Sequence, residues 1–255
     1  MSSQATLARW RHALSTINPP SGQLDPVSKW LVITRAGVLP MTLTAGAIAG
    51  LLAVGRHDFA AGWFALAFVG ITLAHVSNNL VNDLFDTSEG LDTGDYPRAL
   101  YAPHPILSGM ISKRGLINAA IAVNVADVLI LIVLVAARGW VVLAFGLAGV
   151  ILNVAYTAPP LRLKKRGLGE LDVLLVWGPL LIAGTYYSAV GHVPWQVWPA
   201  SIPYGLLCTA VLMAKHIDKL VIAVVFVSVA PMLWKGWQKW RSGRRPAALP
   251  VNVMK

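Results

Sequence analysis

Apolar stretches long enough to cross a lipid bilayer recur along the whole sequence. Hydrophobic residues make up 56% of the 255 residues, and charged residues only 13%, about half the share of an ordinary soluble domain. Only helices and closed barrels satisfy every backbone polar group inside a bilayer, and the alternating strands of a barrel are absent here. We therefore expect an all-α, polytopic membrane protein.

The apolar runs predict seven spans separated by polar loops. In chain order they are Leu31–Val54, Phe59–Val81, Leu116–Ala137, Trp140–Tyr156, Leu171–Val190, Trp198–Ala214 and Leu220–Trp234. The last is close to the minimum length for a crossing. The predicted organisation is a cytoplasmic tail over residues 1–30, a transmembrane domain over 31–234 and a basic tail over 235–255.

Basic residues concentrate in alternate loops, and this bias indicates the orientation. They lie before the first span and after the second, fourth and sixth spans, whereas the other loops hold little beyond Arg56 and Arg138. We expect the basic loops to lie on the cytoplasmic side. We also expect the protein to lie in the plasma (inner) membrane. The net charge of +10 then reflects topology and contact with lipid headgroups, because these residues are too scattered for a nucleic-acid surface.

The segment NDLFDTSEGLD (82–92) places carboxylates at the end of the second span. Asn79, Asp83 and Asp86 are separated by four and three residues, so they fall on one helical face, and His75 extends that stripe one turn deeper. Ionisable groups that face inward at a membrane boundary usually serve function. Because Mg²⁺ prefers oxygen ligands and shares them with substrate phosphates, this face is a candidate magnesium site.

Carboxylates in the following loop, Asp92 and Asp95, have two interpretations. They are either ordinary solvated loop charges or additional oxygen ligands for the same ion. Their positions in the sequence leave both open.

The loop YTAPPLRLKKRGLGEL (156–171) is the second informative segment. Pro159 and Pro160 end the fourth helix, and four basic residues follow: Arg162, Lys164, Lys165 and Arg166. The topology bias alone explains most of them. Beside a magnesium site, however, they would neutralise a phosphate leaving group. The two loops together predict a diphosphate held at the cytoplasmic interface, with a long apolar tail among the helices.

These two segments resemble conserved motifs of the UbiA superfamily of membrane prenyltransferases, in the form seen in the menaquinone-pathway branch. The first span, with Arg35, Gly46 and Gly50, is also similar, and the resemblance covers roughly residues 29–219. It implies a helical bundle, usually of nine spans, around a central cavity. It also implies Mg²⁺-dependent transfer of a prenyl group from a polyprenyl diphosphate to an aromatic (quinone-precursor) or other lipophilic acceptor in the membrane.

The resemblance also implies roles for individual residues. The catalytic carboxylates would be Asp83, Asp86 and Asp218, and the magnesium ligands would be Asp83, Asp86, Asp92 and Asp218. The substrate-binding residues would be Asn79, Tyr156, Lys164 and Arg166.

The sequence departs from the family pattern after the sixth span. KHIDKL (215–220) resembles the start of the second aspartate motif, with Asp218 as its first carboxylate, but Ile222 stands where the partner carboxylate is expected. Two alternatives therefore stay open. The chain could be a shortened, non-catalytic homologue, or a membrane transporter, although the broken-helix repeats of transporters are not found.

Overall fold

The computed structural model describes residues 3–15, 24–88, 104–157 and 160–214, and within these ranges it contains helices and turns but no strand. The elements in chain order are α1 (Ser3–Ser15), α2 (Pro26–Ile33), η1 (Ala36–Val38), α3 (Pro40–Ala53), α4 (Ala61–Ser88), α5 (Lys113–Arg138), α6 (Trp140–Thr157), η3 (Leu163–Arg166), α7 (Gly169–Leu175), η4 (Val176–Leu180) and α8 (Leu181–Val190). A further helix covers Val197–Ala214.

Five described helical stretches are long and apolar enough to cross a membrane: Ala36–Ala53, Ala61–Phe85, Lys113–Arg138, Gly169–Val190 and Val197–Ala214. Trp140–Tyr156 is apolar but shorter. These six segments match the first six predicted spans, which confirms the all-α polytopic class. The predicted seventh span, Leu220–Trp234, and the basic tail lie outside the described residues.

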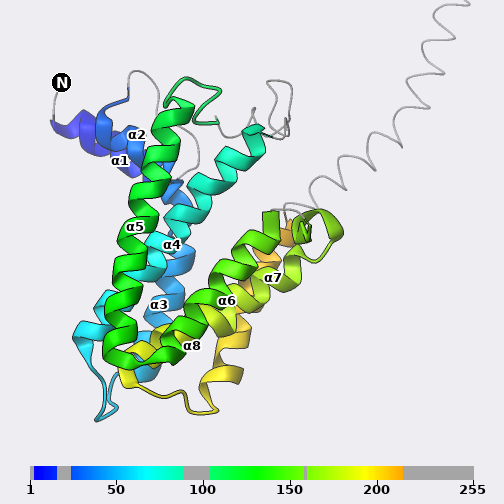
Figure 1. The fold of residues 1–255 in the computed structure, drawn as a ribbon. Coiled ribbons are helices and arrows are strands. Elements are labelled where there is room, and N and C mark those ends of the chain that lie inside the picture. The colour runs from blue at the N-terminus through cyan, green and yellow to red at the C-terminus, as the bar shows by residue number, and fades with distance from the viewer. Residues whose placement is uncertain (1–2, 16–23, 89–103, 158–159, 215–255) are drawn as a thin grey trace, which may run out of the picture. The chain divides into compact units, whose positions relative to one another are not determined.

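The chain divides into two units, Met1–Thr209 and Ala210–Lys255, and the described part of the second is a single short helical stretch over 210–214. Within the first unit the long helices alternate in direction (Figure 1). The C-terminal end of α4, the N-terminal end of α5 and the connection between α6 and α7 therefore lie at the same end of the bundle. The predicted site residues that the structure describes belong to this end: Asn79, Asp83, Tyr156, Lys164 and Arg166.

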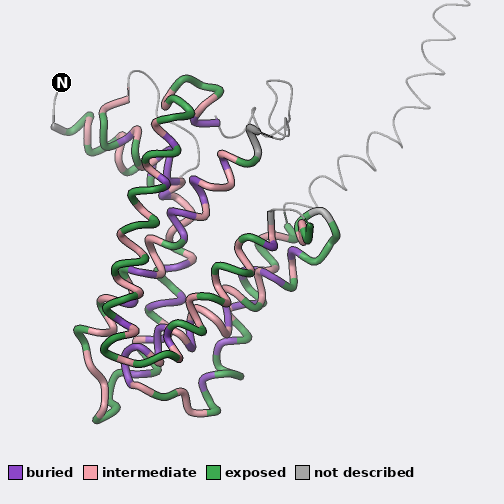
Figure 2. Tube along the Cα trace, in the orientation of Figure 1, coloured by how far each residue is buried: buried purple, intermediate pink, exposed green. Residues whose placement is uncertain are grey.

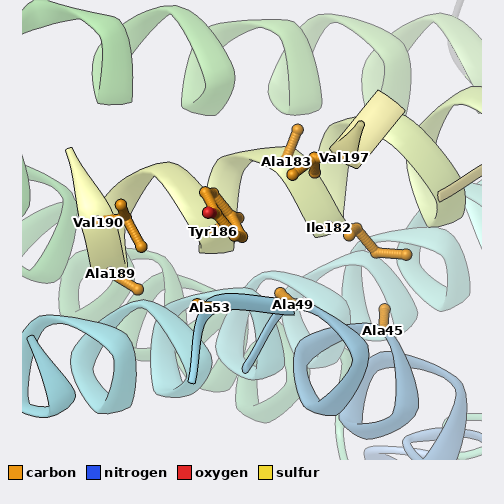
Figure 3. Packing of buried hydrophobic residues seen from close by; sticks show 9 residues of the cluster. All are labelled: Ala45, Ala49, Ala53, Ile182, Ala183, Tyr186, Ala189, Val190 and Val197. Atoms are coloured by element: carbon orange, nitrogen blue, oxygen red, sulfur yellow. The ribbon is translucent and has the colours of Figure 1, made fainter. Parts of the chain in front are cut away.

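The core of the bundle is built from small residues. Ala45, Ala49 and Ala53 form a fully buried stripe on α3, and this stripe packs against Ile182 and Tyr186 of α8 (Figure 3). Small side chains at four-residue spacing let two membrane helices approach closely, which compensates for the weak hydrophobic drive between helices in lipid. The α3–α8 contact thus forms a closely packed, buried core within the bundle.

Large apolar side chains on α5 point away from this core. Ile121, Val125, Leu129 and Ile132 are all more than half exposed, and Figure 2 shows the exposed face along the helix. In a bilayer these side chains would contact lipid, where exposed apolar surface carries no penalty.

The predicted first span is interrupted in the structure. Residues 31–54 were expected to form one helix, but α2 ends at Ile33 and α3 begins only at Pro40. Between them Arg35 adopts a left-handed backbone conformation (φ 55°, ψ 47°), which continues neither helix. The break turns the Arg35 side chain towards α4. The break therefore matters for the site, because it brings Arg35 to Asp83.

The predicted N-terminal tail contains ordered helices. Asp25 caps α2 by accepting hydrogen bonds from the backbone N–H groups of Val27 and Ser28, both at 3.0 Å, and from the Ser28 hydroxyl at 2.5 Å. Trp10 on α1 donates to the same carboxylate at 3.1 Å. Hydrogen bonds from Ser28 and Trp10 hold the pKa of Asp25 well below its ordinary value of 3.8. The carboxylate therefore joins α1 to α2.

Candidate functional site at the end of α4

Three residues of the stripe predicted on α4 lie on one buried face in the structure. His75, Asn79 and Asp83 occupy successive turns, and each is at least nine-tenths buried. Asp86 also lies on α4, but its side chain is outside the described part of the chain, as are Asp92 and Asp218. The structure therefore describes one of the four predicted magnesium ligands, Asp83.

Asp83 forms an ion pair with Arg35 at the break between α2 and α3. The Asp83 side chain is fully buried, the Arg35 side chain is 24% exposed, and the guanidinium donates to Oδ1 of the carboxylate. A buried carboxylate is tolerated only when a positive charge and hydrogen-bond donors compensate it. Arg35 supplies that compensation from 48 residues away in the sequence.

Two further hydrogen bonds fix the position of this ion pair. Asn79 donates from Nδ2 to the backbone carbonyl of Thr34 at 3.0 Å, which holds the chain immediately before Arg35. His104 donates from Nε2 to the backbone carbonyl of Asp83 at 3.1 Å, and its Nδ1 accepts from the N–H of Ile106 at 3.2 Å. Because a carbonyl only accepts and an amide N–H only donates, His104 is the neutral Nε2–H tautomer.

Arg35 and His104 both contact Asp83, and sequence reasoning did not place either of them in the site. The similarity of the first span included Arg35, yet nothing in the sequence assigned it to Asp83. His104 follows the acidic loop closely, and its sequence position alone gave it no role. Both act through tertiary contacts.

The predicted diphosphate-binding residues lie on a separate loop. Lys164 and Arg166 belong to η3 and are exposed, and Arg166 donates to the backbone carbonyl of Pro160 at 2.9 Å. Tyr156 is half-buried and packs against Gly169, where a Cβ atom would lie 3.2 Å from Tyr156 Cε2. This loop is at the same end of the bundle as the C-terminal end of α4, the helix that carries Asp83 (Figure 1).

The described part of the predicted magnesium site consists of the Asp83 carboxylate alone. Among the described residues no group of three or more His, Cys, Asp and Glu side chains could hold a metal. The one predicted ligand that is described offers a carboxylate oxygen, which is a hard donor of the kind Mg²⁺ prefers.

An apolar groove of about 520 Å³ runs between α4 and α5 near the same end. It is lined by Val81, Leu84, Ile117, Ala120, Ile121, Asn124, Val125, Val128 and Leu129. The groove is open on one side, and its lining suits a hydrocarbon chain from a lipid or a prenyl group.

Comparison with known proteins gives a consistent result. The model of the UbiA prenyltransferase family matches residues 43–221. The chain is 26% identical to UbiA prenyltransferase domain-containing protein 1 of Dictyostelium discoideum, over 74% of this chain and 59% of the relative. It is 28% identical to the 2-carboxy-1,4-naphthoquinone phytyltransferase of Synechocystis, over 70% of this chain and 55% of the relative.

A third relative is the 1,4-dihydroxy-2-naphthoate octaprenyltransferase of Escherichia coli, which is 28% identical over 74% of this chain and 63% of the relative. The matched part of the chain thus spans 55% to 63% of the length of these three relatives. No solved structure matches the chain.

Proposed function

This chain belongs to the UbiA prenyltransferase family, and we propose that it transfers a prenyl group from a polyprenyl diphosphate to an aromatic quinone precursor within the membrane. The bond from the allylic carbon to oxygen breaks, with its electron pair leaving on the diphosphate. The allylic carbon then bonds to the acceptor, which loses a proton.

The observation that carries this proposal is the fully buried Asp83 carboxylate at the end of α4, compensated by Arg35. A buried charge has a large desolvation cost, and such sites usually serve function. The position of this charge also suits a diphosphate headgroup, because it lies near the end of a membrane helix whose first half is apolar.

Mg²⁺, when bound, would neutralise developing charge on the diphosphate. Asp83 would hold it together with Asp86, Asp92 and Asp218, which the family resemblance adds. Asn79 keeps the backbone of the α2–α3 break in place by its bond to Thr34.

The substrate-binding roles complete the proposed site. Lys164 and Arg166 would bind diphosphate oxygens from the basic loop. Tyr156 would line the cavity. Arg35 orients the Asp83 carboxylate through their ion pair.

The acceptor proposed first is a hydroxylated naphthoate, because two of the relatives carry naphthoquinone or naphthoate in their names. The proposed location is the plasma (inner) membrane, with the diphosphate site on the cytoplasmic side. The charge bias of the loops supports this orientation, since η3 carries one of the basic clusters.

The test is a transfer assay on the purified chain in detergent with Mg²⁺, 1,4-dihydroxy-2-naphthoate and polyprenyl diphosphates of several lengths. Prenylated product is measured by mass spectrometry, and released pyrophosphate is measured in parallel. Asp83→Asn should abolish transfer, as should chelation of the metal. Asp58→Asn is the matched control, because this carboxylate lies in the loop between α3 and α4, at the opposite end of α4.

A second candidate is a non-catalytic homologue, favoured by Ile222 at the position of the expected partner carboxylate. It predicts neither product nor pyrophosphate with any donor. A transporter would instead show solute uptake without pyrophosphate release.

A further inference from the structure

His75 is held in a buried junction of three helical segments. Thr42 on α3 contacts its Nδ1 through Oγ1 at 2.7 Å. The ring of Trp177 on η4 packs edge-on against the imidazole, with 4.8 Å between ring centroids and an angle of 73° between planes. The His75 residue is only 8% exposed. Its orientation is therefore fixed by neighbours from outside its own helix.

The backbone of η4 determines where Trp177 lies. This segment is a π-helical turn that contains Pro179, and π-helical turns inside α-helices often occur at functional sites. The adjacent Gly178 packs against the helix Val197–Ala214, where a Cβ atom would meet the carbonyl oxygen of Ser201 at 3.0 Å and Cα of Gly205 at 3.2 Å. The tight packing keeps η4, and with it the Trp177 ring, in one position against His75.

The two ring nitrogens of His75, Nδ1 and Nε2, differ in their hydrogen bonding. Within the described part of the chain, the contact with Thr42 is the one hydrogen bond that the imidazole makes, and it uses Nδ1. Nε2 makes no hydrogen bond with a described residue, and it is not one of the fully buried atoms that lack a partner, so it borders accessible space in which a ligand atom can bind. The Thr42 hydroxyl can donate or accept, so both neutral tautomers of His75 are compatible with this contact.

The chemistry of Nε2 therefore selects the class of partner. A hydroxyl group both donates and accepts, so it satisfies Nε2 in either tautomer. A prenyl chain has no polar atom to offer at this depth, whereas a hydroxylated aromatic ring does.

The distance along α4 agrees with such a partner. His75 precedes Asp83 by eight residues, which corresponds to about 12 Å along the helix axis. A metal-bound diphosphate at Asp83, followed by the reacting carbon and an aromatic ring, covers a span of this order.

We propose that His75 binds a hydroxyl group of the aromatic acceptor through Nε2, with Thr42 and Trp177 holding the imidazole in place. This inference rests on the proposed prenyl transfer and adds the residue that positions the acceptor. The acceptor class is a hydroxylated bicyclic aromatic, because a ring that reaches His75 with its hydroxyl can keep its other end near the reacting carbon.

The test uses two substitutions that each preserve one side of the imidazole. The amide of His75→Asn lies near the Nδ1 position and retains the bond to Thr42. The amide of His75→Gln reaches the Nε2 position and retains a group for the ligand. Purified wild type and both variants are titrated with 4-hydroxy-2-naphthoate and with 2-naphthoate, which lacks the hydroxyl.

The expected result is that wild type binds the hydroxylated probe about five- to tenfold more tightly than the hydroxyl-free one, the value of one hydrogen bond. His75→Gln keeps this preference, and His75→Asn loses it. In the transfer assay, His75→Asn raises KM for the acceptor and leaves KM for the diphosphate unchanged. A purely structural role for His75 predicts the opposite order of the two variants.

Equal affinity of the wild type for the two probes would overturn the inference even if neither variant folds. So would a preference that survives in His75→Asn. Failure of the proposed function looks different: the wild type keeps its preference for the hydroxylated probe but makes no prenylated product with any donor.

Discussion

Removal of the Arg35–Asp83 ion pair is the perturbation that most directly tests the proposed site. Arg35→Met keeps an apolar stem of similar length, and Asp83→Asn keeps the shape of the carboxylate while removing its charge. Both groups belong to one contact, so the two single variants and the double variant form a double-mutant cycle. The cycle measures the interaction of the two side chains separately from their other contacts.

The magnitude follows from burial. Two unit charges in contact at about 3 Å attract by about 5.5 kcal/mol at an effective dielectric constant of 20, and desolvation offsets much of this. Asp83 is fully buried, so Arg35→Met leaves a carboxylate without its countercharge. Breaking a buried pair in this way costs roughly 3–5 kcal/mol. We expect Arg35→Met to lower the free energy of unfolding by about 3 kcal/mol, with a coupling of about 2–3 kcal/mol in the cycle.

The single cysteine of the chain can report unfolding in this assay. Cys208 is the single cysteine in the sequence and is buried, with 4% exposed surface. A thiol-reactive fluorescent dye therefore labels it only when the protein unfolds. Labelling during titration with a denaturing detergent gives the free energy of unfolding for wild type and each variant.

A surface ion pair of the same chemistry provides the control. Arg56 and Asp58 lie 3.5 Å apart in the loop between α3 and α4, with side chains 41% and 25% exposed. Pairs of this kind contribute little, because water and salt screen them. The cycle Arg56→Met and Asp58→Asn should give no resolvable coupling. If the effects of Arg35→Met and Asp83→Asn are additive, the two side chains do not compensate each other and the reasoning is wrong.

Three further predictions also concern unfolding, followed by Cys208 labelling for the first two and by circular dichroism for the pH series, because a thiol does not react with the dye at acidic pH. Gly205→Ala should destabilise by roughly 2–4 kcal/mol, because its Cβ would lie 2.5 Å from a backbone carbonyl oxygen, whereas Gly62→Ala, which meets open space, should be neutral or stabilising. Arg138→Leu should cost about 1–3 kcal/mol, because its guanidinium donates to two backbone carbonyls of α8 at 2.9 and 3.0 Å. The folded pKa of Asp25 lies below the unfolded value of 3.8, so the advantage of wild type over Asp25→Asn should be complete at pH 7 and shrink as pH falls below 3.8. A constant difference across that pH range would contradict the capping role.

The sequence predicted the helices and one face of the site. Apolar runs indicate spans because a bilayer admits few other backbone arrangements, and six predicted spans match helices in the structure. The spacing of Asn79 and Asp83 predicted a shared buried face, because helical geometry depends only on residues close in the chain. Both inferences needed only local periodicity.

Local periodicity could not predict the break in the first span. The stretch from Leu31 to Val54 is apolar enough to continue as one helix, and Pro40 is equally compatible with a kink. The left-handed conformation of Arg35 is maintained by its ion pair with Asp83 and by the bond from Asn79 to Thr34. The backbone conformation is thus decided by contacts with another helix.

The sequence alone determined that this chain spans a membrane as helices and that one of them ends in carboxylates. Only the tertiary structure decided which positive charge compensates the buried one and which side chains surround His75. The contacts that do so join residues 48 and 33 positions apart. Compensation of a buried charge or hydrogen-bonding group depends on distance in space, and the packing of separate helices sets that distance.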